Sequence, residues 1–280
     1  MTYNEICISL ANAEIENNRG ETAMLICHFC NVTKADLLLR RDEDFDSPEL
    51  AEAVQKRCQH YPLQYILGYW DFCNETYKVT ENTLIPRQDT EKLVELAIKL
   101  IPENARIIDL CTGSGCVAIS TLAARHDCHA VAVDLFAETL AVARENAEAN
   151  GVGDRMGFLA QDVLYPAFMD SLGTFDAIVS NPPYIPESDR ALMRPNVTEH
   201  EPDIALFVED SDPLVFYRAI ARTGSKMLAE NGRVYFEIYE SLVDEMVAML
   251  ESEGYVDVVV REDFRGKPRM ICARVSSTTR

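Results

Sequence analysis

The sequence is short of positive charge. Only 26 lysines and arginines stand against 46 aspartates and glutamates, which leaves a formal charge of −20. Binding of duplex nucleic acid depends on contacts between cationic side chains and phosphates, and so acidic a surface repels it. We therefore expect no direct binding to nucleic acid, and a neutral or basic protein is the better-suited partner.

Long apolar runs and paired cysteine motifs are also scarce. No apolar stretch is long enough to cross a bilayer, and the chain does not open on a charged-then-apolar leader. The nine cysteines are scattered, and the one C-x-x-C pair, Cys27 with Cys30, has no second pair or nearby histidine pair to complete a zinc site. We expect a cytoplasmic protein without membrane contact and without a bound metal.

The chain divides into a helical part and a larger α/β part. Over residues 1–70, apolar residues recur at helical spacing, which predicts a domain of about four short helices. Aromatic and β-branched residues then indicate a β-hairpin linker over 71–86, with Asn74-Glu75 between its strands. The remaining domain is expected over 87–280.

Strand and helix patterns alternate throughout this larger domain. Strands are predicted at 106–110, 129–134, 156–160, 175–180, 233–239, 255–262 and 269–275, and helices at 116–124, 137–150, 212–229 and 240–252. Such alternation predicts a mostly parallel sheet covered on both faces, with an antiparallel pair at the end. The fold class is therefore α/β, with a seven-stranded, Rossmann-like sheet after a small helical domain.

A glycine-containing turn joins the first strand, which ends in Asp109, to the helix that follows. Gly113 and Gly115 let the backbone bend tightly and let a ligand approach. The pattern is not the dinucleotide G-x-G-x-x-G, because Ala118 takes its last position, and no lysine-bearing phosphate loop is present. A nucleoside without a phosphate chain fits better, although the turn alone could be a structural loop.

Carboxylates at the ends of two further strands favour a ligand site over a structural loop. Asp134 ends the second strand, where it can accept hydrogen bonds from both hydroxyls of a ribose. Asp162 follows the third strand, where it can bind an adenine amino group. Open α/β sheets bind their ligands at this edge.

The fourth strand runs directly into Asn181-Pro182-Pro183-Tyr184. The prolines fix the backbone and remove two N–H donors, so the Asn181 side-chain oxygen and the Pro182 carbonyl can each accept one N–H of an NH₂ group. Tyr184 can stack on the planar group that carries this NH₂, and its face suits a cationic sulfonium. Two such acceptors would orient an amide lone pair for in-line displacement on a sulfonium methyl. The alternative is a rigid turn without a chemical role.

These motifs together resemble class I methyltransferases of exocyclic or amide nitrogens. Other segments narrow the resemblance to the HemK/PrmC family, the glutamine-N5 methyltransferases of peptide-chain release factors. These segments are Tyr65-Ile66-Leu67-Gly68, residues 84–91, Phe175 through Pro186, Glu201-Pro202 with Ala205-Leu206, and residues 263–269. The resemblance covers nearly the whole chain.

The resemblance implies S-adenosylmethionine as methyl donor and S-adenosylhomocysteine as product. The implied cofactor-binding residues are Asp109, Cys111, Thr112, Gly113, Ser114, Gly115, Asp134, Asp162, Val163 and Asn181. The implied substrate is the glutamine of a Gly-Gly-Gln loop in class 1 release factors, whose methylation modulates translation termination. Its implied binding residues are Asn181, Pro182, Pro183 and Tyr184, with Asn181, Pro182 and Tyr184 as the catalytic set. The N-terminal helical domain would help to hold the release factor.

The chain departs from the family pattern at two positions. Gln88 stands where the family usually has proline, and Cys111 where it usually has glycine, so the backbone at Cys111 must turn with a Cβ present. Arg87 and Glu91, at a helix start, could shape the cofactor pocket or form a surface pair.

Several alternatives stay open. An adenine-N6 methyltransferase would use the same Asn-Pro-Pro-Tyr, although the acidic charge and the absence of a basic recognition segment count against it. A catalytically silent adaptor would keep the fold without binding the cofactor. Glu199-His200-Glu201 could suggest a metal, but a solvated loop is the simpler interpretation. Residues 185–211 lack periodicity and predict a long, substrate-facing loop. Nothing marks an obligate interface, so we expect a monomer.

Overall fold

The chain forms two compact units. The computed structural model describes residues 1–165, 167, 171–263 and 265–276, so Phe264 of the 263–269 segment lies outside the described residues. One unit comprises Met1–Tyr69 together with Met193–Glu201, and the other comprises Trp70–Leu192 and Pro202–Arg280. The short segment Met193–Glu201, which follows the Asn-Pro-Pro-Tyr motif in sequence, thus belongs to the helical unit, which no local pattern indicated.

The helical unit begins with five α-helices rather than about four. They are α1 (Tyr3–Asn12), α2 (Asn18–Phe29), α3 (Lys34–Leu39), α4 (Pro48–Cys58) and α5 (Leu63–Leu67). Thr2 caps α1 and Ser47 caps α4 by accepting hydrogen bonds from backbone N–H groups of the first turn. Leu10, Leu25 and Leu50 from three of the helices lie in a shared, fully buried core, so packing and caps together stabilise helices that are individually short.

A β-hairpin of β1 (Tyr69–Phe72) and β2 (Glu75–Lys78) follows. Cys73 and Asn74 form its turn, with φ of 50° and 68°. Two successive left-handed residues are typical of the two-residue turns whose twist matches a hairpin. The turn therefore lies one residue before the predicted Asn74-Glu75, because asparagine tolerates the second left-handed position. The Glu91 carboxylate accepts the Cys73 N–H at 3.0 Å and holds this turn.

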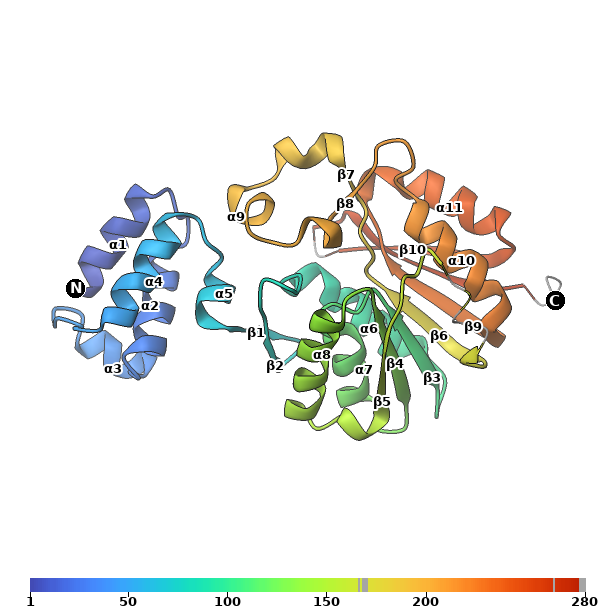
Figure 1. Cartoon of the computed structure of the whole chain (residues 1–280), viewed down its shortest axis with the longest axis horizontal. Coiled ribbons are helices and arrows are strands. Elements are labelled where there is room, and N and C mark those ends of the chain that lie inside the picture. Colours follow the sequence, from blue (N-terminus) through green and yellow to red (C-terminus); the bar gives the residue numbers. More distant parts are fainter. Residues whose placement is uncertain (166, 168–170, 264, 277–280) are drawn as a thin grey trace. The chain divides into compact units, whose positions relative to one another are not determined.

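The seven-stranded, mostly parallel sheet predicted from the sequence is confirmed (Figure 1). Its order is β10 (Tyr255–Glu262), β11 (Pro268–Val275), β9 (Leu228–Glu237), β6 (Phe175–Ser180), β3 (Arg106–Leu110), β4 (His129–Asp134) and β5 (Met156–Ala160). Only β11 runs against its neighbours. Strand β9 begins earlier than the predicted Arg233 because Asn231, at φ 66°, allows an irregularity that carries the pairing back to Leu228.

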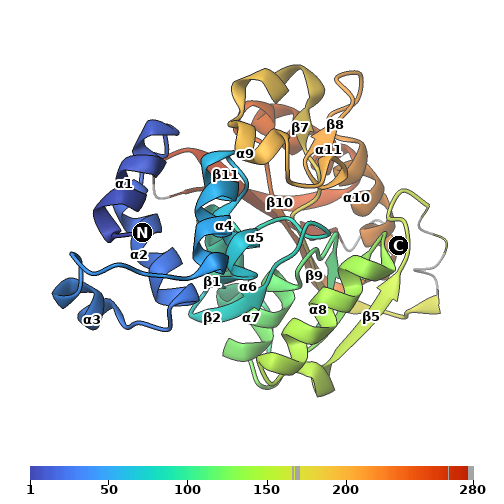
Figure 2. The same ribbon diagram turned by 60° about the vertical axis from the view of Figure 1, so that its left-hand side comes forward.

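Helices cover both faces of the sheet (Figures 1 and 2). They are α6 (Glu91–Leu100), α7 (Cys116–Ala124), α8 (Ala137–Ala149), α10 (Val215–Met227) and α11 (Val243–Ser252). Ile107 of β3 packs into the core with α6 and α7, and the next residue, Ile108, packs into the core with α10 and α11. Successive residues of a strand point to opposite faces, so the continuous apolar runs seen in the sequence are required by a sheet buried on both sides.

The sequence predicted one long loop over residues 185–211, but these residues form several short elements instead. They form β7 (Ile185–Pro186), the 3₁₀ turns at Glu187–Leu192 and Asp203–Ala205, α9 (Pro195–Thr198) and β8 (Phe207–Val208). Strands β7 and β8 pair in parallel. Each element is too short to show a period in the sequence, which is why the prediction was wrong here.

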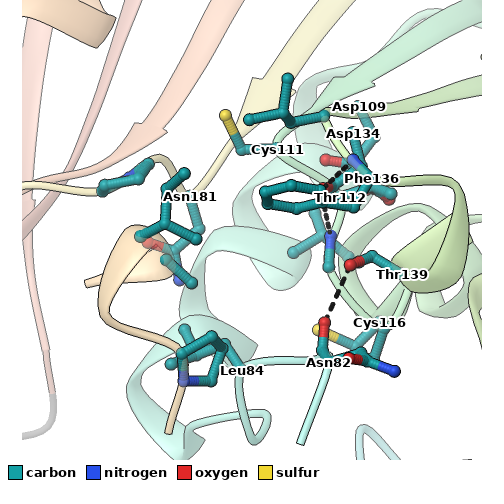
Figure 3. Close-up of a pocket in the computed structure, with 18 of the residues that line it drawn as sticks. Asn82, Leu84, Asp109, Cys111, Thr112, Cys116, Asp134, Phe136, Thr139 and Asn181 are labelled. Atoms are coloured by element: carbon teal, nitrogen blue, oxygen red, sulfur yellow. Dashed lines mark hydrogen bonds between the residues drawn. The ribbon is translucent and has the colours of Figure 1, made fainter. Parts of the chain in front are cut away.

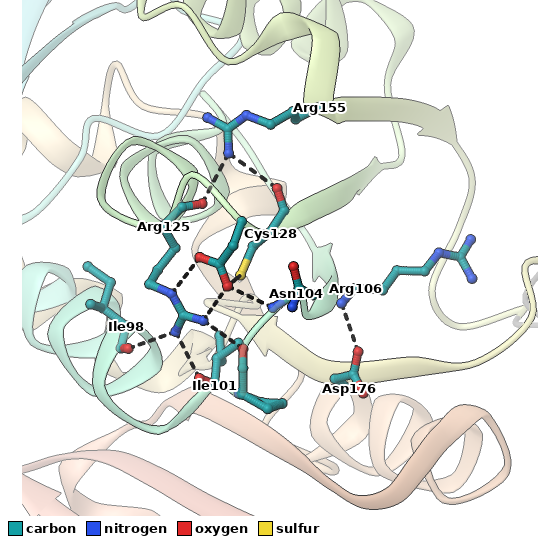
Figure 4. A network of polar contacts seen from close by, with 10 residues as sticks. Ile98, Ile101, Asn104, Arg106, Arg125, Cys128, Arg155 and Asp176 are labelled. Carbon is teal, nitrogen blue, oxygen red and sulfur yellow. Dashed lines mark hydrogen bonds and ion pairs between the residues drawn. The ribbon is translucent and has the colours of Figure 1, made fainter.

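A polar network ties the segments that precede β3, β4 and β5 (Figure 4). The Arg125 guanidinium donates to the carbonyls of Ile98, Ile101 and Pro102 at 3.2, 2.8 and 2.7 Å. It also pairs with Asp127, and this pairing holds the pKa of the Asp127 carboxyl well below its usual range. The network lies at the amino ends of these strands, on the edge of the sheet opposite to the carboxyl ends where open α/β sheets bind ligands.

Candidate active site

A cavity of about 410 Å³ lies at the carboxyl ends of β3, β4, β5 and β6 (Figure 3). Nine of the ten residues expected to bind the cofactor line it: Asp109, Cys111, Thr112, Gly113, Ser114, Asp134, Asp162, Val163 and Asn181. Pro183 lines it as well, whereas Gly115, Pro182 and Tyr184 do not. The topology thus brings side chains from four strand ends to one cavity.

Left-handed backbone shapes the turn between β3 and α7. Cys111, Gly113 and Gly115 have φ of 62°, 56° and 83°. The backbone therefore does turn at Cys111 with a Cβ present, a conformation that disfavours an L-residue by about 1–2 kcal/mol. At Gly113 no atom lies within 4 Å of where a Cβ would stand, so its bare backbone faces the cavity.

Gly115 serves packing rather than the cavity. A Cβ there would stand 2.7 Å from Ile119 Cδ1 and 3.3 Å from the Ala143 Cβ of α8. These distances are shorter than ordinary van der Waals contact, so the glycine lets α7 begin close against α8. The structure thus separates two glycines that the sequence motif treats alike.

Asp109 lies beneath the turn and is 1% exposed. Its Oδ2 accepts hydrogen bonds from the Thr112 hydroxyl at 2.7 Å and from the Ala118 N–H at 3.3 Å. Burial raises the pKa of this carboxyl to about 7, against the lowering effect of both hydrogen bonds. Asp109 therefore fastens the turn to α7 and holds a proton at a higher pH than an exposed carboxyl would.

Asp134 and Asp162 present acceptor groups at the cavity wall. Asp134 accepts the N–H of Gly113 at 2.9 Å, and Asp162 accepts the N–H of Leu164 at 2.8 Å. Burial raises the pKa of Asp134, and backbone hydrogen bonds, first that of Gly113, lower it. A carboxylate has about four lone-pair positions, so each side chain keeps capacity for hydroxyl or amino donors of a ligand.

An apolar wall, which was not predicted from the sequence, lies beside these carboxylates. Leu135 and Phe136 directly follow Asp134, line the cavity and are 43% and 42% exposed. Leu84, Ile85 and Phe216 also line it. An aromatic residue two positions after a strand-end carboxylate was the signal available in the sequence, because such a ring suits a planar base.

In the Asn181–Tyr184 segment, Asn181 and Pro183 line the cavity, whereas Tyr184 is half-buried and lies outside the cavity lining. The Asn181 side-chain nitrogen donates to Thr90 Oγ1 at 3.4 Å. The Tyr184 hydroxyl donates to Glu237 Oε1 at 2.8 Å, and its ring stacks on Tyr239 with centroids 5.9 Å apart. Burial, followed by the neighbouring Glu237, raises the pKa of Tyr184. Tyr184 is thus anchored at its hydroxyl end.

Two buried polar residues, Thr90 and Glu237, adjoin this segment and were not singled out from the sequence. Each is 2% exposed, and the Thr90 hydroxyl donates to Glu237 Oε2 at 2.6 Å. Thr90 lies in the 84–91 segment quoted above, whereas Glu237 offered no signal beyond a carboxylate inside the strand predicted at 233–239. In the same segment Arg87 lines the cavity, whereas Glu91 holds the hairpin turn instead.

The part of the chain that the structure describes contains neither a cluster of metal ligands nor a membrane-spanning helix. Within it, no group of three or more histidine, cysteine, aspartate or glutamate side chains is arranged to hold a metal ion. His200 packs edge-to-face against Tyr61 instead, with ring centroids 5.1 Å apart. None of the helices in those residues is both long and apolar enough to cross a membrane.

Known proteins match both parts of the chain. The family model of the PrmC N-terminal domain matches residues 3–68, and that of the methyltransferase small domain matches residues 89–197. The release factor glutamine methyltransferase of Bacteroides thetaiotaomicron is 37% identical over 261 residues, covering 92% of this chain and 93% of that protein. The protein of the same name from Flavobacterium psychrophilum is 38% identical over 251 residues, 87% of each chain.

A solved structure from Streptococcus mutans, described as a SAM-dependent methyltransferase, has a TM-score of 0.50 and 15% identity. The match covers 72% of this chain and 54% of that one. At this identity the likeness concerns the fold alone, and it agrees with the seven-stranded sheet.

Proposed function

This chain belongs to the family of release factor glutamine methyltransferases, and from that membership we propose its substrate and mechanism. We propose that it transfers the methyl group of S-adenosylmethionine to the N5 amide nitrogen of the glutamine in the Gly-Gly-Gln loop of class 1 peptide-chain release factors. The observation that carries the proposal is the position of Asn181 and Pro183 in the wall of the same cavity as Asp134 and Asp162.

The cavity residues fit the nucleoside part of S-adenosylmethionine. The Asp134 carboxylate would accept the ribose hydroxyls and Asp162 the adenine amino group, while Leu135 and Phe136 offer apolar surface to the base. Cys111, Thr112, Gly113, Ser114 and Val163 would line the rest of the cofactor. When bound, the cofactor supplies an electrophilic methyl group on a sulfonium.

The Asn-Pro-Pro-Tyr segment would hold the acceptor glutamine. The Asn181 side-chain oxygen and the Pro182 carbonyl would each accept one N–H of the substrate amide, which turns its nitrogen lone pair toward the methyl group. The same acceptors would stabilise the positive charge that develops on nitrogen during transfer. Pro183 and Tyr184 would confine the planar amide, and the Tyr184 hydroxyl, held by Glu237, keeps its ring in place.

The helical domain would recognise the protein substrate. We propose that residues 1–70 help to hold the release factor, that 71–86 link the domains, and that 87–280 carry out the transfer. The charge of −20 suits a basic or neutral protein surface. We propose that the enzyme acts as a monomer in the cytoplasm.

Mass spectrometry of a purified release factor incubated with the protein and S-adenosylmethionine tests the proposal. One added methyl on the Gly-Gly-Gln glutamine is expected, and it should be lost with Asn181→Ala. Asn150→Ala is the matched control, because this half-buried asparagine donates to the Thr76 carbonyl of the hairpin and lines no part of the cavity. A release factor left unmodified, with methyl transferred to an adenine-containing nucleic acid instead, would overturn the substrate assignment.

A further inference from the structure

A single buried carboxylate contacts two of the motifs found in the sequence. Glu237, at the end of β9, accepts the hydroxyl of Thr90 at Oε2 and the hydroxyl of Tyr184 at Oε1, at 2.6 and 2.8 Å. Thr90 lines the cavity and directly precedes helix α6, and Tyr184 ends the Asn-Pro-Pro-Tyr segment. The carboxylate therefore connects both motifs from behind the cavity.

The Thr90 hydroxyl is restricted to one hydrogen-bonding role toward Asn181. A hydroxyl has one hydrogen and two lone pairs. Because Thr90 donates its hydrogen to Glu237, it can only accept from its other neighbour, the Asn181 side chain. The two ends of an asparagine amide differ in this respect, since the nitrogen donates and the oxygen accepts. Thr90 consequently selects the nitrogen end, which is the end found at 3.4 Å from its Oγ1.

This selection decides which atom Asn181 presents to a substrate. With Nδ2 turned toward Thr90, Oδ1 is the end that turns away from it. The mechanism proposed above needs an acceptor at this position, because the substrate amide brings two N–H donors. A reversed amide would place the Asn181 NH₂ opposite the NH₂ of the substrate. Two donor groups that face each other form no hydrogen bond, because neither offers an acceptor.

We propose that Glu237 and Thr90 are positioning residues for the methyl transfer. Glu237 orients the Thr90 hydroxyl, and Thr90 orients the Asn181 amide so that its oxygen meets the acceptor glutamine. The inference rests on the proposed function, because it assigns that acceptor role to Asn181. It adds two residues whose proposed effect on the reaction passes through Asn181, one of them, Thr90, in the cavity wall.

The ionised form of Glu237 suits this role, because only a carboxylate accepts at both oxygens. Burial raises the pKa of Glu237, whereas the hydroxyls of Thr90 and Tyr184 and the guanidinium of Arg269 lower it. Arg269, at the start of β11, thereby gives the 263–269 segment a function in the same network. Its charge offsets part of the penalty for burying the carboxylate.

Steady-state kinetics of the full-length protein, with a release factor and S-adenosylmethionine, test the inference. Thr90→Val keeps the shape and removes the hydroxyl, and Glu237→Gln keeps the shape but turns one acceptor into a donor. Each is expected to lower kcat about tenfold or more, with the KM for release factor and the Kd for cofactor within about threefold, because the charge on nitrogen develops only in the transition state.

Two further variants separate positioning from stability. Thr90→Ser keeps the hydroxyl and should retain at least about half of the wild-type kcat. Thr223→Val is the matched control: this buried threonine donates to the Ala219 carbonyl of its own helix, α10, so kcat should not change. Thermal unfolding of every variant checks that the assayed protein is folded.

The possible outcomes are distinct. A wild-type protein that does not methylate the release factor refutes the proposed function itself. An active wild type with an unchanged kcat in Thr90→Val, or with Thr90→Ser as impaired as Thr90→Val, refutes the positioning role alone. A tenfold loss of kcat with rescue by Thr90→Ser supports it.

Discussion

Replacing Gly115 with alanine is expected to lower the free energy of unfolding of the α/β unit by about 2–5 kcal/mol. Two effects add. The left-handed backbone, at φ 83°, disfavours an L-residue by about 1–2 kcal/mol. A Cβ at 2.7 Å from Ile119 Cδ1 and 3.3 Å from the Ala143 Cβ overpacks the junction of α7 and α8, which typically costs about 1–3 kcal/mol more.

Gly151→Ala isolates the first effect. Gly151 follows α8 with φ 69°, and no atom lies within 4 Å of where its Cβ would stand. Its replacement should cost about 1–2 kcal/mol from the backbone alone. Urea unfolding at equilibrium gives both free energies, and the difference between the two variants measures the crowding at Gly115.

Ile119→Val completes the comparison, because it deletes the Cδ1 atom nearest to the added Cβ. In the Gly115→Ala background this change should recover part of the loss, although by itself it typically costs about 0.5–1.5 kcal/mol. Equal losses in Gly115→Ala and Gly151→Ala, with no recovery from Ile119→Val, would refute the reasoning from packing.

Three further predictions concern other parts of the α/β unit. The pKa of Asp109 is about 7 in the folded state against an ordinary value of 3.8, so between these pH values the folded state holds a proton that the unfolded state has lost. Stability should therefore fall as pH rises from about 4 to about 7, and urea unfolding of Asp109→Asn should lack this part of the slope. Arg125→Met should lower the free energy of unfolding by about 2–4 kcal/mol, because three backbone carbonyls lose their donor, and a value below about 0.5 kcal/mol would contradict that. Tyr184→Phe leaves Glu237 Oε1 without its hydroxyl donor and should lower the free energy of unfolding, measured by thermal unfolding, by about 1–3 kcal/mol. An unchanged free energy would show that the bond adds no stability.

Local patterns were sufficient for most elements of the sheet. The strands at Arg106–Leu110, His129–Asp134 and Phe175–Ser180 have the predicted bounds, because their apolar runs are short and end at turn residues. The same patterns were insufficient where an element depends on its neighbour. Strand β9 starts at Leu228, inside a polar stretch, because pairing with β6 holds it there.

For the candidate site, the sequence by itself determined which strand ends carry polar side chains and glycines, and nine of the ten expected cofactor residues line one cavity. Parallel topology requires this, since it gathers the carboxyl ends of the strands at one edge. Only the tertiary structure decided that Gly115 packs against Ala143 while Gly113 faces the cavity. It alone placed Glu237 between Thr90 and Tyr184. Those residues are far apart in the chain, and no periodicity or turn preference encodes a contact that arises when separate elements pack together.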